Sequence, residues 1–339
     1  MRIGLVYDLR DDYRALGFTE EQVAEFDSPD TIDALAGTLK SLGCQVTRIG
    51  HGRTLATRLA AGERWDMVFS IAEGVAGRSR EAQVPALCEL FDQPYVFSDP
   101  LTMAATLDKA VAKRLVRDAG IVTAPFAVLE TPAQAATAAM SFPAFVKPLA
   151  EGTGKGCEAA SLVCDREEMT LAAARLISRF RQPDLVESYL PGREFTVGVI
   201  GNGAGARVIA VLEVILREQA SDQVYSFDMK EQCERFVTYA LADDAEARLA
   251  GARALAAYAS LGCRDAARLD FRSDDAGSPH FLEANPIAGL HPTHSDLPIL
   301  TTQAGYSYSW LIAAILNCAA ERQGLTHLLH ADTCAALAA

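Results

Sequence analysis

The sequence lacks most features that mark a membrane, secreted or nucleic-acid-binding protein. Its basic residues are outnumbered, with 31 Lys and Arg against 44 Asp and Glu, which gives a formal net charge of −13. This balance argues against general binding to a phosphate backbone, although a local basic pocket for a small anion is compatible with it. No apolar run approaches the roughly 18 residues of a membrane span. We therefore expect no nucleic-acid partner and no membrane insertion.

The eight cysteines are scattered and include no CxxC pair. The N-terminal apolar run MRIGLVYD is too short for a secretory core region, so reduced thiols and a cytoplasmic location are expected. Internal repeats and low-complexity linkers are also lacking. A chain of 339 residues exceeds one typical core and predicts two or three packed units.

The first unit, residues 1–97, alternates strand-like and helix-like runs. RIGLVY, CQVTRIG, WDMVFSIAEG and QPYVFSDP read as strands, and TIDALAGTLKSLG and EAQVPALCELF read as helices. Such alternation predicts an α/β unit with a doubly wound, Rossmann-like parallel sheet. The stretch at 7–30 reads as an acidic irregular loop. Ligands gather beyond the carboxyl ends of such strands, so this loop and the 73–81 loop are candidate substrate walls.

The rest of the chain changes character and predicts α+β organisation. Residues 98–186 form a small central unit, in which an alanine-rich helix is expected between the strands FAVLE and FPAFVKP. Residues 187–325 form a third unit with a largely antiparallel sheet, the helix DAEARLAGARALAAYASLG and the helix YSWLIAAILNCAAERQG. Residues 326–339 have weak signals and read as a loosely held tail.

The segment RLDFRSDDAGSPHFLEAN reads as two antiparallel strands joined by the turn SDDAGSP. A register with Asp270 opposite Glu283 also sets Arg268 opposite Asn285, and it predicts Arg272 opposite Phe281. Side chains two apart on a strand share a face, so the polar members would look into one space. The other face would be apolar, formed by Leu269, Phe271, Leu282 and Ala284.

Two carboxylates about 5 Å apart repel each other unless a cation lies between them. Asp, Glu and Asn offer hard oxygen ligands, which suit Mg²⁺ together with water and phosphate. We interpret Asp270, Glu283 and Asn285 as metal ligands. The alternative is a solvated hairpin with incidental acids, and for an isolated Asp/Glu pair that alternative is the better one.

A magnesium site calls for a phosphate partner. Lys147 ends the apolar strand FPAFVKP, and the glycine-rich EGTGKG beyond it can bring backbone N–H groups close to an anion. The Walker spacing GxxxxGK[ST] is absent. A glycine-rich turn alone is more often a plain hairpin, and Lys109 alone would be a solvated helix lysine.

Taken together, four stretches resemble the ATP-grasp superfamily, and within it the D-alanine–D-alanine ligase family. They are LDKAVAKRLVRDAGIVTAPF, FVKPLAEGTGKG, LVESYLPGREFTVGVIG and LGCRDAARLDF…FLEANPIAGLHPTHS, within a resemblance over about residues 1 to 320. The resemblance implies an ATP-grasp fold and an ADP-forming carboxylate–amine ligase that joins two amino acids through an acyl phosphate. It implies ATP and two Mg²⁺ ions, with Mn²⁺ as an alternative, small amino acid substrates, and compatibility with a homodimer.

The same resemblance assigns residues to roles. Phosphate and nucleotide contacts would come from Lys109, Lys147, the loop residues Glu151, Gly152, Thr153 and Gly154, and from Glu187, Leu190 and Glu194. The catalytic residues would be Arg268, which would steady the charge of the reaction, and Lys230, which would reach the γ-phosphate. The metal ions would be held by Asp270, Glu283 and Asn285.

The substrate walls depart from the family pattern. The family's short first loop carries a glutamate that holds the first amino group, whereas here that loop is long and places Phe26 near this position. The family's His-Gly motif is replaced by Glu73-Gly74, and the segment after Asn285 has an extra residue. These differences predict a different amino acid pair and a poor D-alanine ligase. Candidate substrate residues are Glu25, Asp27, Glu73, Arg78, Arg80 and Ser295, each of which alone reads as well as an ordinary surface or loop residue.

Two other functions compete with the ligase. A catalytically silent ATP-binding or scaffold relative would have no need for both metal carboxylates. An ATP-grasp phosphotransferase or carboxylase is the second alternative; a carboxylase usually has a biotinyl partner, and nothing in the chain resembles a biotin-accepting segment. The identity and chirality of the substrates, the pathway and the oligomeric state are open at the level of sequence.

Overall fold

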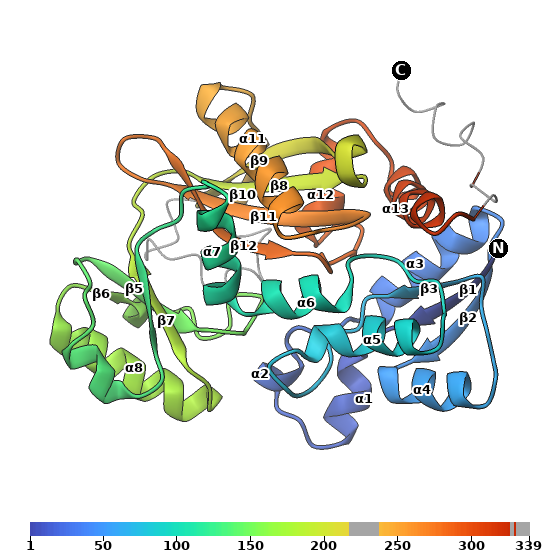
Figure 1. Ribbon diagram of the computed structural model, residues 1–339, viewed down its shortest axis with the longest axis horizontal. Helices are drawn as coiled ribbons and strands as arrows, with labels where there is room; N and C mark the ends of the chain where they lie inside the picture. The colour runs from blue at the N-terminus through green and yellow to red at the C-terminus, as the bar shows by residue number, and fades with distance from the viewer. Residues whose placement is uncertain (217–236, 326–328, 330–339) are drawn as a thin grey trace.

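The computed structural model describes residues 1–216, 237–325 and 329. Its strands form a three-stranded, a four-stranded and a five-stranded sheet. In Figure 1 the three-stranded sheet lies at the opposite end of the molecule from the four-stranded sheet, with the large sheet above and between them. The six described cysteines are free thiols. Among the described residues, no helix combines the length and apolar character needed to cross a membrane.

The N-terminal sheet is parallel, in the order β2-β1-β3. Its strands are β1 (Arg2–Val6), β2 (Gln45–Gly50) and β3 (Met67–Ser70). Alternation along β1 sends Ile3 and Leu5 to one core and Val6 to another. The first core is covered by α3 (Pro29–Ser41), and the second by α4 (Gly52–Ala60) and α5 (Gln83–Leu90). Helices on both faces are as predicted; the fourth expected strand, QPYVFSDP, is reduced to a single bridge between Val68 and Tyr95.

The first loop is more ordered than its composition suggested. It contains α1 (Arg10–Ala15) and α2 (Glu20–Val23), and its ends meet at a bridge between Leu9 and Asp27. Tyr13, Val23 and Phe26 form a small buried cluster, with the Tyr13 and Phe26 ring centroids 4.6 Å apart. The prediction of an irregular loop was wrong because aromatic residues spaced along a polar stretch pack on one another.

The central unit has an antiparallel sheet in the order β4-β7-β5-β6. Its strands are β4 (Phe126–Leu129), β5 (Ala144–Pro148), β6 (Leu162–Val163) and β7 (Asp184–Ser188), and α8 (Arg166–Phe180) covers it. The helices α6 (Pro100–Leu107) and α7 (Lys109–Asp118) lead into it. The expected alanine-rich helix is only a 3-10 segment, Pro132–Ala136, of which Ala135 alone is buried. Without an apolar face to bury, helical propensity does not build a longer helix.

The large sheet is antiparallel throughout, in the order β10-β9-β8-β11-β12. Its strands are β8 (Glu194–Ile200), β9 (Arg207–Leu216), β10 (Val237–Leu241), β11 (Ala266–Ser273) and β12 (Pro279–Asn285). The helix α11 (Ala245–Ser260) packs on one face through buried alanines, which allow a close approach. On the other face lies α12 (Asp296–Gln303): a Cβ at Gly198 would come 2.9 Å from Leu297 and from Leu300.

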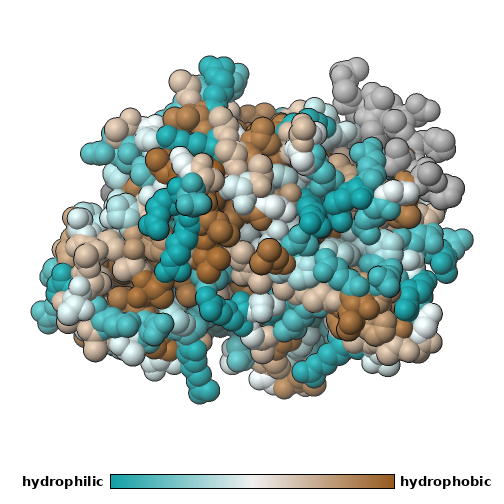
Figure 2. Space-filling model, in the orientation of Figure 1, coloured by the Kyte–Doolittle hydropathy of each residue, from teal (hydrophilic) through white to brown (hydrophobic). Residues whose placement is uncertain are grey.

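The last helix, α13 (Tyr308–Arg322), returns to the N-terminal unit and packs against α3 through Leu311 and Ile315 (Figure 1). Chain segments far apart in sequence therefore share one core. On the face in Figure 2, small groups of apolar residues are interspersed with polar ones.

Candidate active site

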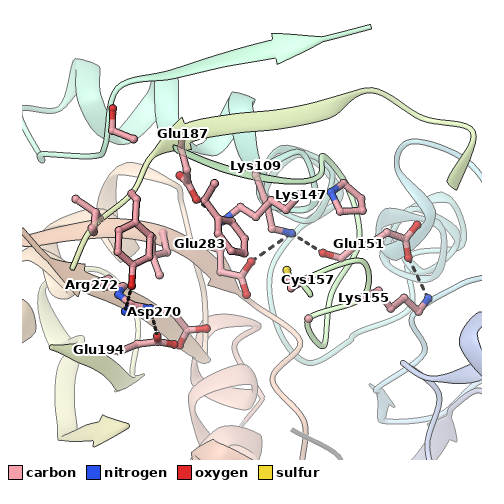
Figure 3. A pocket seen from close by; sticks show the side chains of 17 residues that line it. Lys109, Lys147, Glu151, Lys155, Cys157, Glu187, Glu194, Asp270, Arg272 and Glu283 are labelled. Carbon is pink, nitrogen blue, oxygen red and sulfur yellow. Dashed lines mark hydrogen bonds and ion pairs between the residues drawn. The ribbon is translucent and has the colours of Figure 1, made fainter. Parts of the chain in front are cut away.

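A pocket lies between the small sheet and the β11–β12 hairpin (Figure 3). Nine of the predicted nucleotide and metal residues line it: Lys109, Lys147, Glu151, Gly154, Glu187, Leu190, Glu194, Asp270 and Glu283. Gly152 and Thr153 lie in the same glycine-rich turn, and Arg268 and Asn285 share the hairpin with Asp270 and Glu283. Lys230 falls in the segment 217–236, outside the described residues.

Lys109 is placed by the start of a helix. Asp108 caps α7 by accepting a hydrogen bond from the backbone N–H of Val111, so Lys109 is the first helical residue. Its Nζ lies 3.2 Å from Glu283 and donates to the carbonyl of Glu151 at 2.5 Å. One cation thus joins the glycine-rich turn to the hairpin, as Figure 3 shows.

Lys147 points into the pocket from β5 and is buried. Its Nζ lies 2.6 Å from Glu187 on the neighbouring strand β7. Glu187 also pairs with Lys113 of α7 at 2.8 Å, and Lys113 is fully buried and donates to the carbonyl of Phe281. Sequence reasoning missed Lys113; its spacing of four residues from Lys109, one helical turn, was the available signal.

Burial opposes the ionisation of Glu187, but Lys113 and then Lys147 more than offset it and lower its pKa to about 2. For Lys147, burial favours the neutral amine, yet Glu187 and Glu283 raise its pKa above the ordinary value. Glu187 is therefore an anion and Lys147 a cation at neutral pH. The carboxylate, expected beside adenine, is also the counter-ion that holds Lys147.

The glycine-rich turn needs its glycines for two reasons. Gly154 and Gly156 have φ angles of +73° and +72°, which L side chains rarely adopt. A Cβ at Gly156 would also lie 2.7 Å from Pro148. Lys155, not among the predicted residues, is buried, pairs with Glu151 at 3.0 Å and lies 3.5 Å from Glu25 of the first loop.

The hairpin places the candidate metal residues as predicted. Asp270 is opposite Glu283, and Arg268 is opposite Asn285. Arg268 lies 2.9 Å from Asp270, and the Asn285 amide lies 3.5 Å from the same carboxylate. Within the described chain, no three His, Cys, Asp or Glu side chains gather as a metal centre. Two carboxylates plus an amide, with lysines for a phosphate close by, nevertheless fit the oxygen chemistry of Mg²⁺.

Beyond this point the predicted register was wrong. A bulge after Asp270 sets Phe271 opposite Phe281 and Arg272 opposite His280. Phe281 joins Phe271 in the core with the ring centroids 5.8 Å apart, and Leu282 lines the pocket instead of the apolar face. A bulge inserts one residue into a strand, which strict alternation cannot anticipate.

Arg272 is part of the pocket and was not among the predicted site residues. It lies 3.2 Å from Glu194 and donates to the Tyr189 hydroxyl at 3.2 Å. The Glu194 carboxylate, expected at the ribose, is therefore held by a cation one strand away. An arginine two residues after the candidate metal residue Asp270, on the same strand, was the signal for this role.

Three of the six candidate substrate residues line a neighbouring cavity, which shares Glu151 and Lys155 with the first pocket. Glu25, Arg78 and Arg80 line it, whereas Asp27, Glu73 and Ser295 do not. Both arginines already have carboxylate partners at 2.6 Å, Arg78 with Asp108 and Arg80 with Glu25. Ser295 accepts a hydrogen bond from the backbone N–H of His291.

The acidic residues of the first loop and of the 73–81 loop differ in the direction in which their pKa values are shifted. Burial alone would raise the pKa of Glu25, but Arg80 and Lys155 lower it below its usual range. Burial, together with Glu81 and Glu25, raises the pKa of Glu73 well above its ordinary value. For Glu81, burial raises the pKa to about 7 against the effect of Arg80. Sequence reasoning did not assign Glu81 a role.

Comparisons with known proteins agree on one protein family. The model of the D-ala D-ala ligase C-terminus matches residues 115–317. The chain is 32% identical to the D-alanine–D-alanine ligase of Bordetella petrii over 79% of each chain. It is 34% identical to an uncharacterized protein, y4sG, of Sinorhizobium fredii over 76% of this chain and 75% of the relative. A D-alanine–D-alanine ligase from Bacillus anthracis, crystallised with ATP, superposes with a TM-score of 0.72 at 19% identity, covering 96% of this chain and 99% of its own.

Proposed function

The chain belongs to the D-alanine–D-alanine ligase family of ATP-grasp proteins, and from this premise we propose that it joins two amino acids, or amino-acid-like molecules, through an acyl phosphate. It is an ATP-dependent, ADP-forming ligase that makes a C–N bond. The observation that carries the finer proposal is the meeting of Lys109, Lys147, Asp270 and Glu283 in one pocket. Cations for phosphate and carboxylates for a divalent metal are the two requirements of phosphoryl transfer.

The residues divide the work of the first half-reaction. Lys109 and Lys147 neutralise phosphate oxygens while the donor carboxylate attacks the γ-phosphorus and ADP leaves. Asp270, Glu283 and Asn285 would hold divalent metal, which supplies further charge neutralisation when bound. Both lysines are buried, so little water screens their charge, and their attraction to a phosphate is stronger than it would be at the surface.

In the second half-reaction an amine attacks the acyl carbon and phosphate leaves. Arg268 lies beside both metal carboxylates, 2.9 Å from Asp270 and 3.8 Å from Glu283, where it can stabilise the oxyanion that develops. Water must stay out of the site, because it would hydrolyse the acyl phosphate. The turn at 151–156, which Lys109 ties to the hairpin, is suited to cover the nucleotide.

We further propose that the substrate pair differs from two molecules of D-alanine. The first loop builds its own small core around Phe26, and Glu25 binds Arg80, Lys155 and the backbone N–H of Gly152. Since Arg80 and Arg78 are already neutralised, an acidic substrate would have to displace Glu25 or Asp108 to bind them. The long first loop, which brings Glu25 and Phe26 to this cavity, therefore supports altered selectivity better than unpaired arginines do.

The test is ADP release against a panel of D- and L-amino acids, singly and in pairs, with mass detection of the products. We expect ADP formation that depends on one amino acid, and a condensed product from a pair. ADP release without any dependence on an amino acid, and without a condensed product, would contradict the proposal.

A further inference from the structure

Asp296 lies beside the candidate metal residues but belongs to another element. Arg268 contacts three carboxylates: Nη2 lies 2.9 Å from Asp270 and 3.8 Å from Glu283, and Nη1 lies 3.3 Å from Oδ2 of Asp296. The first two are the metal candidates, whereas Asp296 is the first residue of α12. Its side chain is 16% exposed, so it stays within reach of a small molecule.

The main chain around Asp296 is anchored on both sides. Before it, Ser295 donates its backbone N–H to the carbonyl of His291, and its hydroxyl accepts from the His291 N–H. Gly289 approaches so closely that a Cβ there would lie 2.7 Å from the Ser295 hydroxyl. After it, Leu297 packs on the backbone of Gly198. The carboxylate is thus presented to Arg268 from a fixed position.

The plainest explanation for Asp296 is structural, since an acid in the first turn of a helix stabilises the helix. That explanation does not account for the choice of partner. Arg268 is only partly buried, with its side chain 15% exposed, and is already paired with Asp270; among the described residues Asp296 pairs with Arg268 alone, through one oxygen. The other oxygen of Asp296 can accept a hydrogen bond from a cation that enters beside Arg268.

We propose that Asp296 binds the ammonium group of the acceptor, so that the acceptor is a primary amine that enters as its cation. This inference rests on the proposed function. The ammonium gives one proton to the Asp296 carboxylate, and the nitrogen lone pair forms the C–N bond to the acyl carbon. The bond between the acyl carbon and the phosphate oxygen breaks, phosphate leaves with the electron pair, and it takes the second proton from nitrogen.

The test separates the two half-reactions with two nucleophiles. Hydroxylamine is largely uncharged at neutral pH, so it should trap the acyl phosphate as a hydroxamate without help from Asp296. The second nucleophile is the best amino acid acceptor of the panel, which is protonated at that pH. The variants are Asp296→Asn, Asp296→Glu and the control Glu167→Gln, which removes an exposed first-turn acid from α8.

For Asp296→Asn we expect hydroxamate formation within about twofold of the wild type. The kcat/KM for the amine should fall on the order of 30-fold at pH 7, through kcat as well as KM, because the group that accepts the ammonium proton and a charge-assisted bond are both lost. The loss should shrink at pH 9, where more of the amine is uncharged. Asp296→Glu should keep most of the activity toward the amine, and Glu167→Gln should match the wild type in both assays.

Three outcomes overturn the inference. An equal loss of hydroxamate and amine product would assign Asp296 a structural role, and unchanged kinetics toward the amine would leave it no role in acceptor binding. If the wild type forms no hydroxamate with any amino acid, the proposed acyl phosphate itself fails, and the inference fails with it.

Discussion

Replacing Lys113 by Met tests whether a buried ion pair positions the nucleotide-binding lysine. Lys113 is fully buried and shares the Glu187 carboxylate with Lys147. The lowering of the Glu187 pKa from 4.5 to about 2 corresponds to roughly 3 kcal/mol of stabilisation of the anion. That figure is the net effect of burial, Lys113 and Lys147 together, whereas breaking a buried pair by removing one partner costs about 3–5 kcal/mol. We expect the free energy of unfolding of Lys113→Met to fall by about 3 kcal/mol.

The same change should weaken ATP binding. Without Lys113, the remaining cation on Glu187 among the described residues is Lys147. Glu187 then holds Lys147 more tightly and draws it away from the phosphate, so the KM for ATP should rise about tenfold. Urea denaturation measures the first effect, and steady-state kinetics measures the second. The matched control is Arg117→Met, an exposed arginine of the same helix.

A double-mutant cycle decides whether the ion pair is the cause. In Lys113→Met/Glu187→Gln the buried anion is also removed, so the double variant should be more stable than the sum of the single effects predicts, by at least about 1 kcal/mol. Strict additivity would refute the reasoning.

Acid stability gives an independent check. Because the folded-state pKa of Glu187 lies below its unfolded value, its contribution is present above about pH 4.5 and is lost as the pH falls toward 2. Over that range the unfolding free energy of Glu187→Gln should fall less steeply than that of the wild type. Parallel curves in urea titrations would contradict this assignment.

Three further predictions concern the chemistry. Glu283→Gln should keep the fold but lower turnover on the order of 100-fold or more, because charge is lost where phosphate charge develops; near-normal turnover by a folded variant would remove the hairpin from the mechanism. Lys147→Ala should weaken ATP binding and slow acyl phosphate formation, measured by nucleotide titration and single-turnover ADP release, and unchanged values would exclude Lys147 from the site. D-alanine should have a lower kcat/KM than larger amino acids, and Arg80→Ala should alter that preference more than Arg78→Ala, because Arg80 is buried on Glu25 whereas Arg78 is largely exposed. A best kcat/KM for D-alanine, unaffected by either variant, would favour a plain dipeptide ligase.

Local patterns were sufficient for the elements that bury a continuous apolar face. The strand periodicity around β11 and β12 predicted the hairpin, and the structure confirms it together with the supposed register of Asp270 opposite Glu283. The same is true of α11 and α13, whose long apolar patterns needed no tertiary information. The order of the motifs in the sequence was enough to indicate the family, because each motif occupies a fixed place in one fold.

Only the tertiary structure decided the partners of the charged residues. Nothing local pairs Lys113 with Glu187, more than 70 positions later, or Glu25 with Arg80 and the glycine-rich turn. Ion pairs between distant segments depend on how whole units pack, and the sequence records charges without recording which of them meet.

The bulge at Leu282 was also decided by tertiary packing. It was decided by the neighbouring strand and the core, because the Phe281 ring is buried against Phe271 and the following residue is left to line the pocket. The sequence by itself determined which chemistry the chain could carry. It did so because strand and helix periodicity is a local property, which sets which residue types share a face. The tertiary structure decided which carboxylate each cation holds, since those contacts exist only when separate units come together.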